Sequence, residues 1–122
     1  MIERLAELVN GDEDLVRRGR WLTTSMFVAV GEEDYLVRIE RGRIATVAIG
    51  PFVTPSYDFG LAAALSQWQL HWRPLPPPGS HDLFALLRRG VLATSGNLHP
   101  FMSNLRYFKE VLAKPRTLAA SA

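Results

Sequence analysis

Cysteine is absent from this sequence, which excludes disulfide bonds, a thiol nucleophile and cysteine-held zinc or iron–sulfur sites. Long apolar runs are absent too. The longest, Met26–Val30 and Leu61–Leu65, fall well short of the ~20 residues of a membrane-spanning helix. Glu3 stands where the apolar run of a secretory signal would have to begin. From these absences we expect a cytoplasmic protein.

Charge of one sign is not concentrated anywhere along the chain. Fourteen lysine and arginine residues face twelve carboxylates, and the net charge is +2. Basic groups such as Arg17-Arg18 have acidic neighbours such as Asp12–Asp14. Nucleic-acid-binding proteins gather cations along one face, often with aromatic residues between them. The pattern therefore favours a solvated surface of mixed charge and no nucleic-acid partner.

The chain has 122 residues, of which 48% are hydrophobic, and this suffices for one domain with its own core. We expect a single domain over residues 1–122. Within it, residues 1–14 form a helical lead-in, and residues 115–122 form a flexible tail.

Helical spacing of apolar residues predicts four segments besides the helix after the fourth strand, in which Leu65, Trp68 and Trp72 share one side. Short helices are expected over Ile2–Val9 and after Asp12–Asp14, whose negative charge suits the start of a helix. Ser80 is the expected N-cap of a helix over His81–Arg89. A last helix with a broad apolar stripe is expected from Leu98 to Leu112.

Alternation of apolar and polar residues predicts a sheet. Trp21–Val30, Tyr35–Glu40 and Arg43–Ile49 are expected to form an antiparallel meander. A fourth strand over Tyr57–Ala62 turns into a helix, and a fifth strand is expected over Val91–Gly96.

Four of the seven residues of Arg73–Gly79 are proline, which excludes regular structure there. Such a segment can be a ligand for domains with aromatic grooves. We favour a stiff connector within the domain.

No constellation for catalysis or metal binding emerges from the sequence. His71, His81 and His99 fall near the ends of three different predicted helices, whereas a metal site needs ligands that converge. The run Ser80-His81-Asp82 contains the residue types of a catalytic triad, but neighbours on one helical turn point in different directions. We therefore expect no enzymatic activity and no cofactor.

Aromatic and methionine side chains are concentrated on the predicted apolar helix faces: Trp68, Trp72, Phe84, Phe101, Met102 and Phe108. A well-filled core explains such stripes by itself. An apolar cavity between sheet and helices, lined by these adaptable side chains, is the functional alternative.

Several phrases of the sequence resemble the sterol carrier protein type 2 family. They are the meander "YLVRIERGRIATVAIGP", the strand "YDFGLAA", and the segments "DLFALLRRGVL" and "SGNLHPFMSNLRYFKEVL". The resemblance covers about Leu15 to Leu112, and its motifs mark the fold rather than a catalytic signature. The sequence resembles a bacterial member of this family that consists of this domain alone.

The resemblance implies an α+β fold in which a twisted, largely antiparallel five-stranded sheet carries helices on one face and encloses an apolar tunnel. It also implies non-catalytic binding or transfer of an apolar ligand such as a sterol, fatty acid, acyl-CoA or isoprenoid. From the predicted strand and helix faces we expect the lining to consist of Phe27, Val47, Trp68, Trp72, Leu83, Leu87, Phe101, Met102, Leu105 and Phe108.

Two departures from the family pattern bear on this expectation. The insertion Arg73–Gly79 is expected to reshape or close the mouth of the tunnel, and the chain lacks a Ser-Lys-Leu peroxisomal ending. Arg88 and Arg89 could meet lipid headgroups, although a solvated position explains them as well. Transient contact with a membrane surface is a further expectation.

A second hypothesis keeps the fold but not the ligand. Trp68 and Trp72 would then plug the tunnel, and the apolar surface would serve a protein partner or a homodimer. An accessory factor of isoprenoid-quinone biosynthesis would combine ligand binding with assembly. The sequence leaves these alternatives open.

Overall fold

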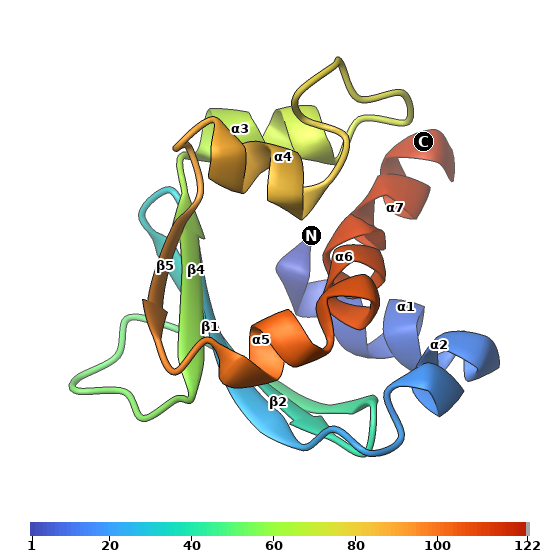
Figure 1. Ribbon diagram of the computed structural model, residues 1–122, viewed down its shortest axis with the longest axis vertical. Helices are drawn as coiled ribbons and strands as arrows, with labels where there is room; N and C mark the ends of the chain where they lie inside the picture. The colour runs from blue at the N-terminus through green and yellow to red at the C-terminus, as the bar shows by residue number, and fades with distance from the viewer. Residues whose placement is uncertain (122) are drawn as a thin grey trace.

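The computed structural model describes residues 1–121, with side chains described through residue 118. Five strands form one mixed sheet in the order β3-β2-β1-β4-β5. The helices lie on one face of this sheet and above one of its ends (Figure 1). This is the α+β architecture predicted from the sequence.

The N-terminal segment forms a short 3-10 helix, Ile2–Arg4, followed by α1, Leu5–Asn10, and α2, Glu13–Arg18. The carboxylate of Asp12 caps α2 by accepting a hydrogen bond from the backbone N–H of Leu15 at 3.1 Å. The Asn10 side chain bonds both the N–H and the carbonyl of Ile44, which fastens α1 to the edge strand β3. The two predicted N-terminal helices are thus confirmed.

Strands β1, Thr24–Val30, β2, Glu33–Glu40, and β3, Arg43–Ile49, form the predicted antiparallel meander. Arg41 and Gly42, both with positive φ, make the two-residue turn between β2 and β3.

Two further strands extend the sheet beyond β1. The fourth strand, β4, Phe59–Ala63, pairs parallel to β1. The fifth strand, β5, Ala93–Gly96, pairs antiparallel to β4. The sheet is therefore largely antiparallel with one parallel pair.

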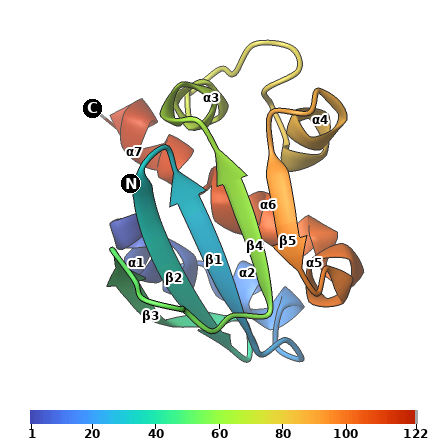
Figure 2. The ribbon, with the colours of Figure 1, turned by 90° about the vertical axis from the view of Figure 1, so that its left-hand side faces the viewer.

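The loop over residues 50–58 joins β3 to β4 and crosses the sheet on the face opposite the helices (Figure 2). Its Phe52 and Tyr57 cover Phe27 of β1, with ring centroids 6.3 and 5.1 Å away. Side chains of β1 alternate between the faces, so Met26 and Val28 point into the core under the helices.

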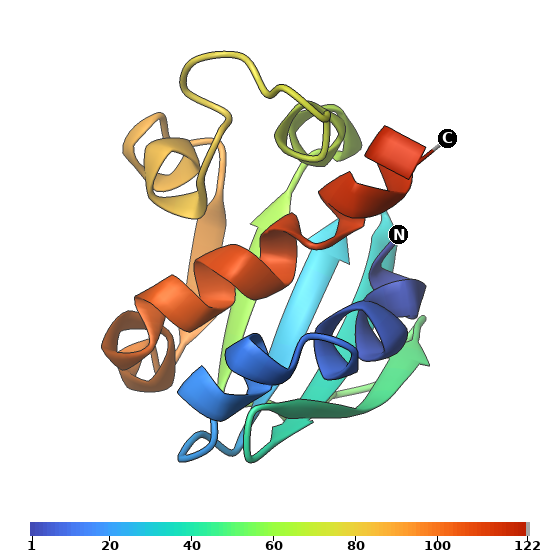
Figure 3. The same ribbon diagram turned by 90° about the vertical axis from the view of Figure 1, so that its right-hand side faces the viewer.

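The remaining helices are α3, Leu65–His71, α4, Leu83–Arg88, α5, His99–Ser103, α6, Leu105–Ala113, and α7, Pro115–Ser121. Helices α6 and α7 run diagonally across the helical side of the sheet, with α1 and α2 on one side and α3 and α4 on the other (Figure 3). None of the helices in the described part is long and apolar enough to cross a membrane.

Three local predictions are corrected. The single last helix is broken at Asn104, whose side chain donates to the carbonyl of Pro100 and so competes with helical bonding. Asp82, not Ser80, caps α4 by accepting from the N–H of Ala85 at 2.9 Å. The segment expected to be a tail continues as α7, and Ala122 lies outside the described residues.

Candidate functional site

Two tryptophans, Trp68 of α3 and Trp72 directly after it, occupy the space between the sheet and α6. Trp68 donates from its indole N–H to the carbonyl of Ala29 on β1 at 3.0 Å, and Trp72 donates to the carbonyl of Leu112 on α6 at 2.8 Å. The two rings stack with centroids 5.3 Å apart, and both side chains are buried. Their polar atoms therefore set the position of α3 while their rings fill the core beside it.

An aromatic cluster continues this layer under α5 and α6. Phe59 of β4, Phe101 of α5 and Phe108 of α6 are fully buried, with pairwise centroid distances between 5.1 and 5.7 Å. The phenol of Tyr107 donates to the carbonyl of Gly42 at 2.6 Å, and burial raises the pKa of this phenol. The helices α5 and α6 are thus anchored both to the middle of the sheet and to the β2–β3 turn.

The structure brings eight of the ten predicted lining residues to the core between sheet and helices. Five are buried and three are half-buried against that core: Trp68, Trp72, Leu83, Phe101 and Phe108, then Val47, Leu87 and Leu105. Two are not brought there. Phe27 lies on the opposite face of the sheet under Tyr57, because it alternates with the inward-facing Met26. Met102 is 51% exposed on α5.

The seam between α4 and α6 carries partly exposed apolar side chains. Phe84 of α4 is 40% exposed, and Lys109 of α6 and Arg88 of α4 lie over its ring at 5.7 and 5.9 Å. Leu87 and Leu105, one from each side, are half-buried. A partly exposed apolar surface with two cations over it thus lies between the two helices.

A buried histidine joins α3 to the segment before α4. His71 is fully buried, and its Nδ1 lies 2.9 Å from the carbonyl oxygen of Ser80. Burial lowers the pKa of His71, and the bond to the Ser80 carbonyl opposes this shift only in part. Sequence analysis placed His71 at a helix end but gave no signal that it would be buried.

Arg116 of α7 forms hydrogen bonds with the backbone around His71. Its guanidinium donates two hydrogen bonds to the carbonyl of His71, at 2.8 and 3.1 Å, and one to the carbonyl of His81 at 3.1 Å. Arg89 similarly donates to the Gly79 carbonyl and to the Ser80 hydroxyl. Arg89 thus bonds the end of the proline-rich connector, and Arg116 bonds the residues on either side of it.

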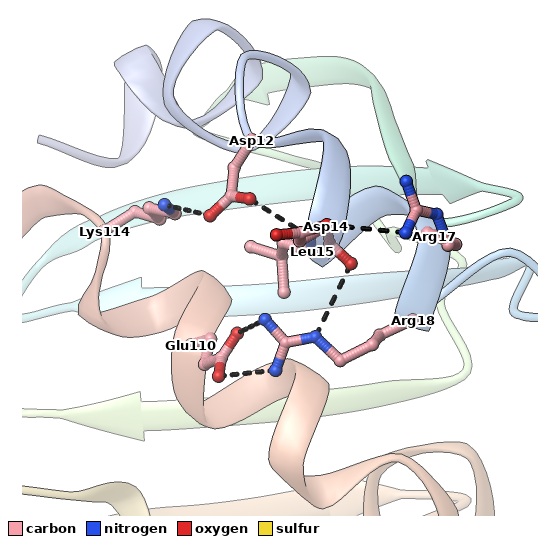
Figure 4. A network of polar contacts seen from close by, with 7 residues as sticks. All are labelled: Asp12, Asp14, Leu15, Arg17, Arg18, Glu110 and Lys114. Carbon is pink, nitrogen blue, oxygen red and sulfur yellow. Dashed lines mark hydrogen bonds and ion pairs between the residues drawn. The ribbon is translucent and has the colours of Figure 1, made fainter.

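A groove of about 530 Å³ is lined by residues of α2, α6 and α7 and their flanks, and by Pro74 of the proline-rich connector. Figure 4 shows its two ion pairs, Lys114 with Asp12 at 2.7 Å and Arg18 with Glu110 at 2.5 Å. Hydrogen bonds from Lys114 and from the N–H of Leu15 lower the pKa of Asp12. These two ion pairs fasten α2 to the end of α6, and the third cation of the lining, Arg116, donates to the carbonyls of His71 and His81.

The triad residue types do not converge. His81 is more than half exposed and lies 3.3 Å from Asp82, whereas the Ser80 hydroxyl is bonded to Arg89 instead. Within residues 1–121 no group of three or more histidine and carboxylate side chains could hold a metal ion.

No protein-family model and no curated protein matches the chain in sequence. Solved structures do match it. The crystal structure of sterol carrier protein 2 superposes with a TM-score of 0.77 at 16% identity, covering 94% of this chain and 92% of that one. A conserved hypothetical protein of Thermus thermophilus, described as possibly a sterol carrier protein, gives 0.69 at 16% identity, covering 93% and 85% of the chains. The ubiquinone synthesis protein UbiJ-SCP2 gives 0.59 at 18% identity, covering 95% and 88%. The geometry and these superpositions together identify the fold as that of sterol carrier protein 2.

Proposed function

We propose that this protein binds an apolar, lipid-like ligand between the sheet and helices α3, α4 and α6, and carries it without chemical change. The observation that carries the proposal is the aromatic layer of Trp68, Trp72, Phe59, Phe101 and Phe108 under short helices in a sterol-carrier fold. Burial of apolar ligand surface contributes about 25 cal/mol per Å², less the cost of ordering ligand and side chains.

Side chains fill this layer, so a ligand enters only if its contacts replace those that the core side chains make with one another. Helix α4 is the element best suited to move, because it has only six residues and follows the proline-rich connector. Displacing α4 opens the seam at Leu87 and Leu105 toward Phe101 and Phe108.

The surface at this seam also supports loading from a membrane. The exposed ring of Phe84 between Arg88 and Lys109 combines an apolar contact with positive charge, which suits an anionic lipid surface.

Binding is tested with a fluorescent fatty-acid probe and by solvent extraction of natively purified protein. We expect the wild type and Leu75→Asp, changed at a 90% exposed position, to bind the probe and release a lipid-like molecule. Leu87→Asp places a charge in the half-buried seam and should lose both. Circular dichroism checks that each variant folds. Absence of probe binding and of any extracted lipid from wild type purified from different hosts would refute the proposal.

The second candidate is an assembly module whose core is permanently filled. It is supported by the burial of Trp68 and Trp72, together with the exposed Ile49 and Val53 near the loop over residues 50–58. A role beside an isoprenoid-quinone pathway would fit the likeness to UbiJ-SCP2. Light scattering across dilution tests this candidate, because a monomer at every concentration without a captured partner speaks against it.

A further inference from the structure

Two buried polar atoms of α3 have no hydrogen-bond partner in the described part of the chain: Oε1 of Gln67 and Nε2 of His71. The His71 side chain as a whole is 0% exposed. Leaving a buried polar group without a partner costs about 1–3 kcal/mol, so such atoms are rare in folded proteins. Two on one short helix require an explanation.

The chemical character of both atoms can be assigned. The Ser80 carbonyl oxygen beside Nδ1 of His71 can only accept, so Nδ1 carries the ring proton. Burial lowers the pKa of His71, which keeps the ring neutral and leaves Nε2 with a free lone pair. The amide oxygen of Gln67 is also an acceptor. Both atoms therefore seek a hydrogen-bond donor.

Both residues lie beside the aromatic layer, on the helix that carries Trp68. Gln67 and His71 are four residues apart on α3 and so lie on one face, a single turn from each other. The bond to Ser80 turns this face toward the start of α4, and the ring of Trp68 meets that of His71 edge-on at 6.1 Å.

We propose that Gln67 and His71 bind the polar end of the ligand and that this end is a hydroxyl, as in a long-chain alcohol or a phenol. The inference rests on the proposed function and names its ligand class. A hydroxyl supplies the donor that the two acceptors lack. A carboxylate supplies only acceptors, and the guanidinium groups of Arg89 and Arg116 already donate to oxygens of the connector and of α3.

The test compares matched ligands that differ only at the polar end: 1-dodecanol, methyl dodecyl ether and dodecanoate, each displacing the fluorescent probe. The ether keeps the oxygen but lacks the donor. We expect dodecanol to bind roughly fivefold to tenfold more tightly than the ether, the ratio that one hydrogen bond supports. Dodecanoate should bind more weakly than dodecanol.

Two further measurements locate the effect. Gln67→Met preserves the side-chain length without the amide and should reduce the preference for dodecanol over the ether. Gln69→Met, at an exposed position on the same helix, should leave that preference unchanged. In the wild type, dodecanol should shift the ¹⁵N resonance of His71 Nε2 and not those of His81 or His99. This readout remains decisive if Gln67→Met fails to fold.

Equal affinity for dodecanol and the ether, or tighter binding of dodecanoate, overturns this inference and leaves the proposed function standing. Failure of all three ligands to displace the probe, together with no bound lipid, overturns both.

Discussion

The indole N–H of Trp72 donates a hydrogen bond to the backbone carbonyl of Leu112 at a distance of 2.8 Å. Leu112 is the penultimate residue of α6, and the last four carbonyls of a helix have no partner within it. The indole therefore satisfies the end of α6 and ties it to α3. One side chain thus couples the two helices that border the proposed ligand site.

Trp72→Phe removes this bond while keeping an aromatic ring. Because the Leu112 carbonyl would be left buried without its partner, we expect the free energy of unfolding to fall by about 1–3 kcal/mol. Urea denaturation measures the change. Trp21→Phe is the control, since Trp21 is 87% exposed, and its stability should stay within about 0.5 kcal/mol of wild type. Equal stability of both variants would show that the bond contributes nothing.

Gly42 and Gly90 both have positive φ, but they differ in their surroundings. A Cβ at Gly42 would lie 2.5 Å from the carbonyl oxygen of Val16, whereas a Cβ at Gly90 meets nothing within 4 Å. Both Ala variants carry the backbone strain of a left-handed conformation, and Gly42→Ala adds steric overlap. In urea denaturation we expect Gly42→Ala to be less stable than Gly90→Ala by roughly 1–3 kcal/mol. Similar losses would contradict the crowding at the β2–β3 turn.

Asp82 caps α4, the helix proposed to move when ligand enters. Asp82→Ala removes the acceptor for the Ala85 N–H and should destabilise the protein by about 1 kcal/mol in thermal or urea unfolding. Asp82→Asn retains a good cap and should recover most of this loss. If Asn behaves like Ala, the carboxylate acts through charge rather than as the cap.

Stability should depend on the protonation of His71. The unfolded chain protonates this residue as the pH falls through about 6.5. In the folded protein burial, with smaller contributions from Arg116 and His81, lowers the pKa of His71, and the bond to the Ser80 carbonyl and the charge of Asp82 oppose this shift only in part. The unfolded state then binds more protons, so the free energy of unfolding falls below about pH 6.5 and levels off below the folded pKa.

Urea denaturation between about pH 7.5 and pH 5 measures this dependence. His71→Gln should flatten it, whereas the exposed His81→Gln and His99→Gln should not. A wild-type slope that His71→Gln leaves intact would assign the titration to another group.

The order of helices and strands was predictable because local signals agree with the tertiary fold. Alternation over Tyr35–Glu40 and Arg43–Ile49 matches strands with one buried face, and the acidic run before Leu15 matches a capped helix. The break at Asn104 was not predictable from the apolar stripe, since the stripe continues across it. Asp82 is the cap because α4 begins at Leu83, directly after it, whereas the Ser80 hydroxyl accepts a hydrogen bond from Arg89.

The candidate site was predictable in outline only. Helical spacing identified Trp68, Leu83 and Phe108 as core residues. For Phe27, the sequence alone left undetermined which face of strand β1 it would lie on. The Gln67–His71 acceptor pair had no sequence signal, because its burial depends on how the proline-rich connector and α7 return to α3. Such long-range contacts are absent from any local pattern.

The central claim, that this fold holds an apolar ligand, is tested most directly by native mass spectrometry of freshly purified protein against its denatured mass. The account predicts an excess of roughly a few hundred daltons, the mass of a lipid-like molecule of the size such pockets bury. Denaturation should release that mass, and the released molecule should carry a hydroxyl. A native mass equal to the denatured mass in preparations from different hosts, as monomer or dimer, would contradict the account and favour the assembly module.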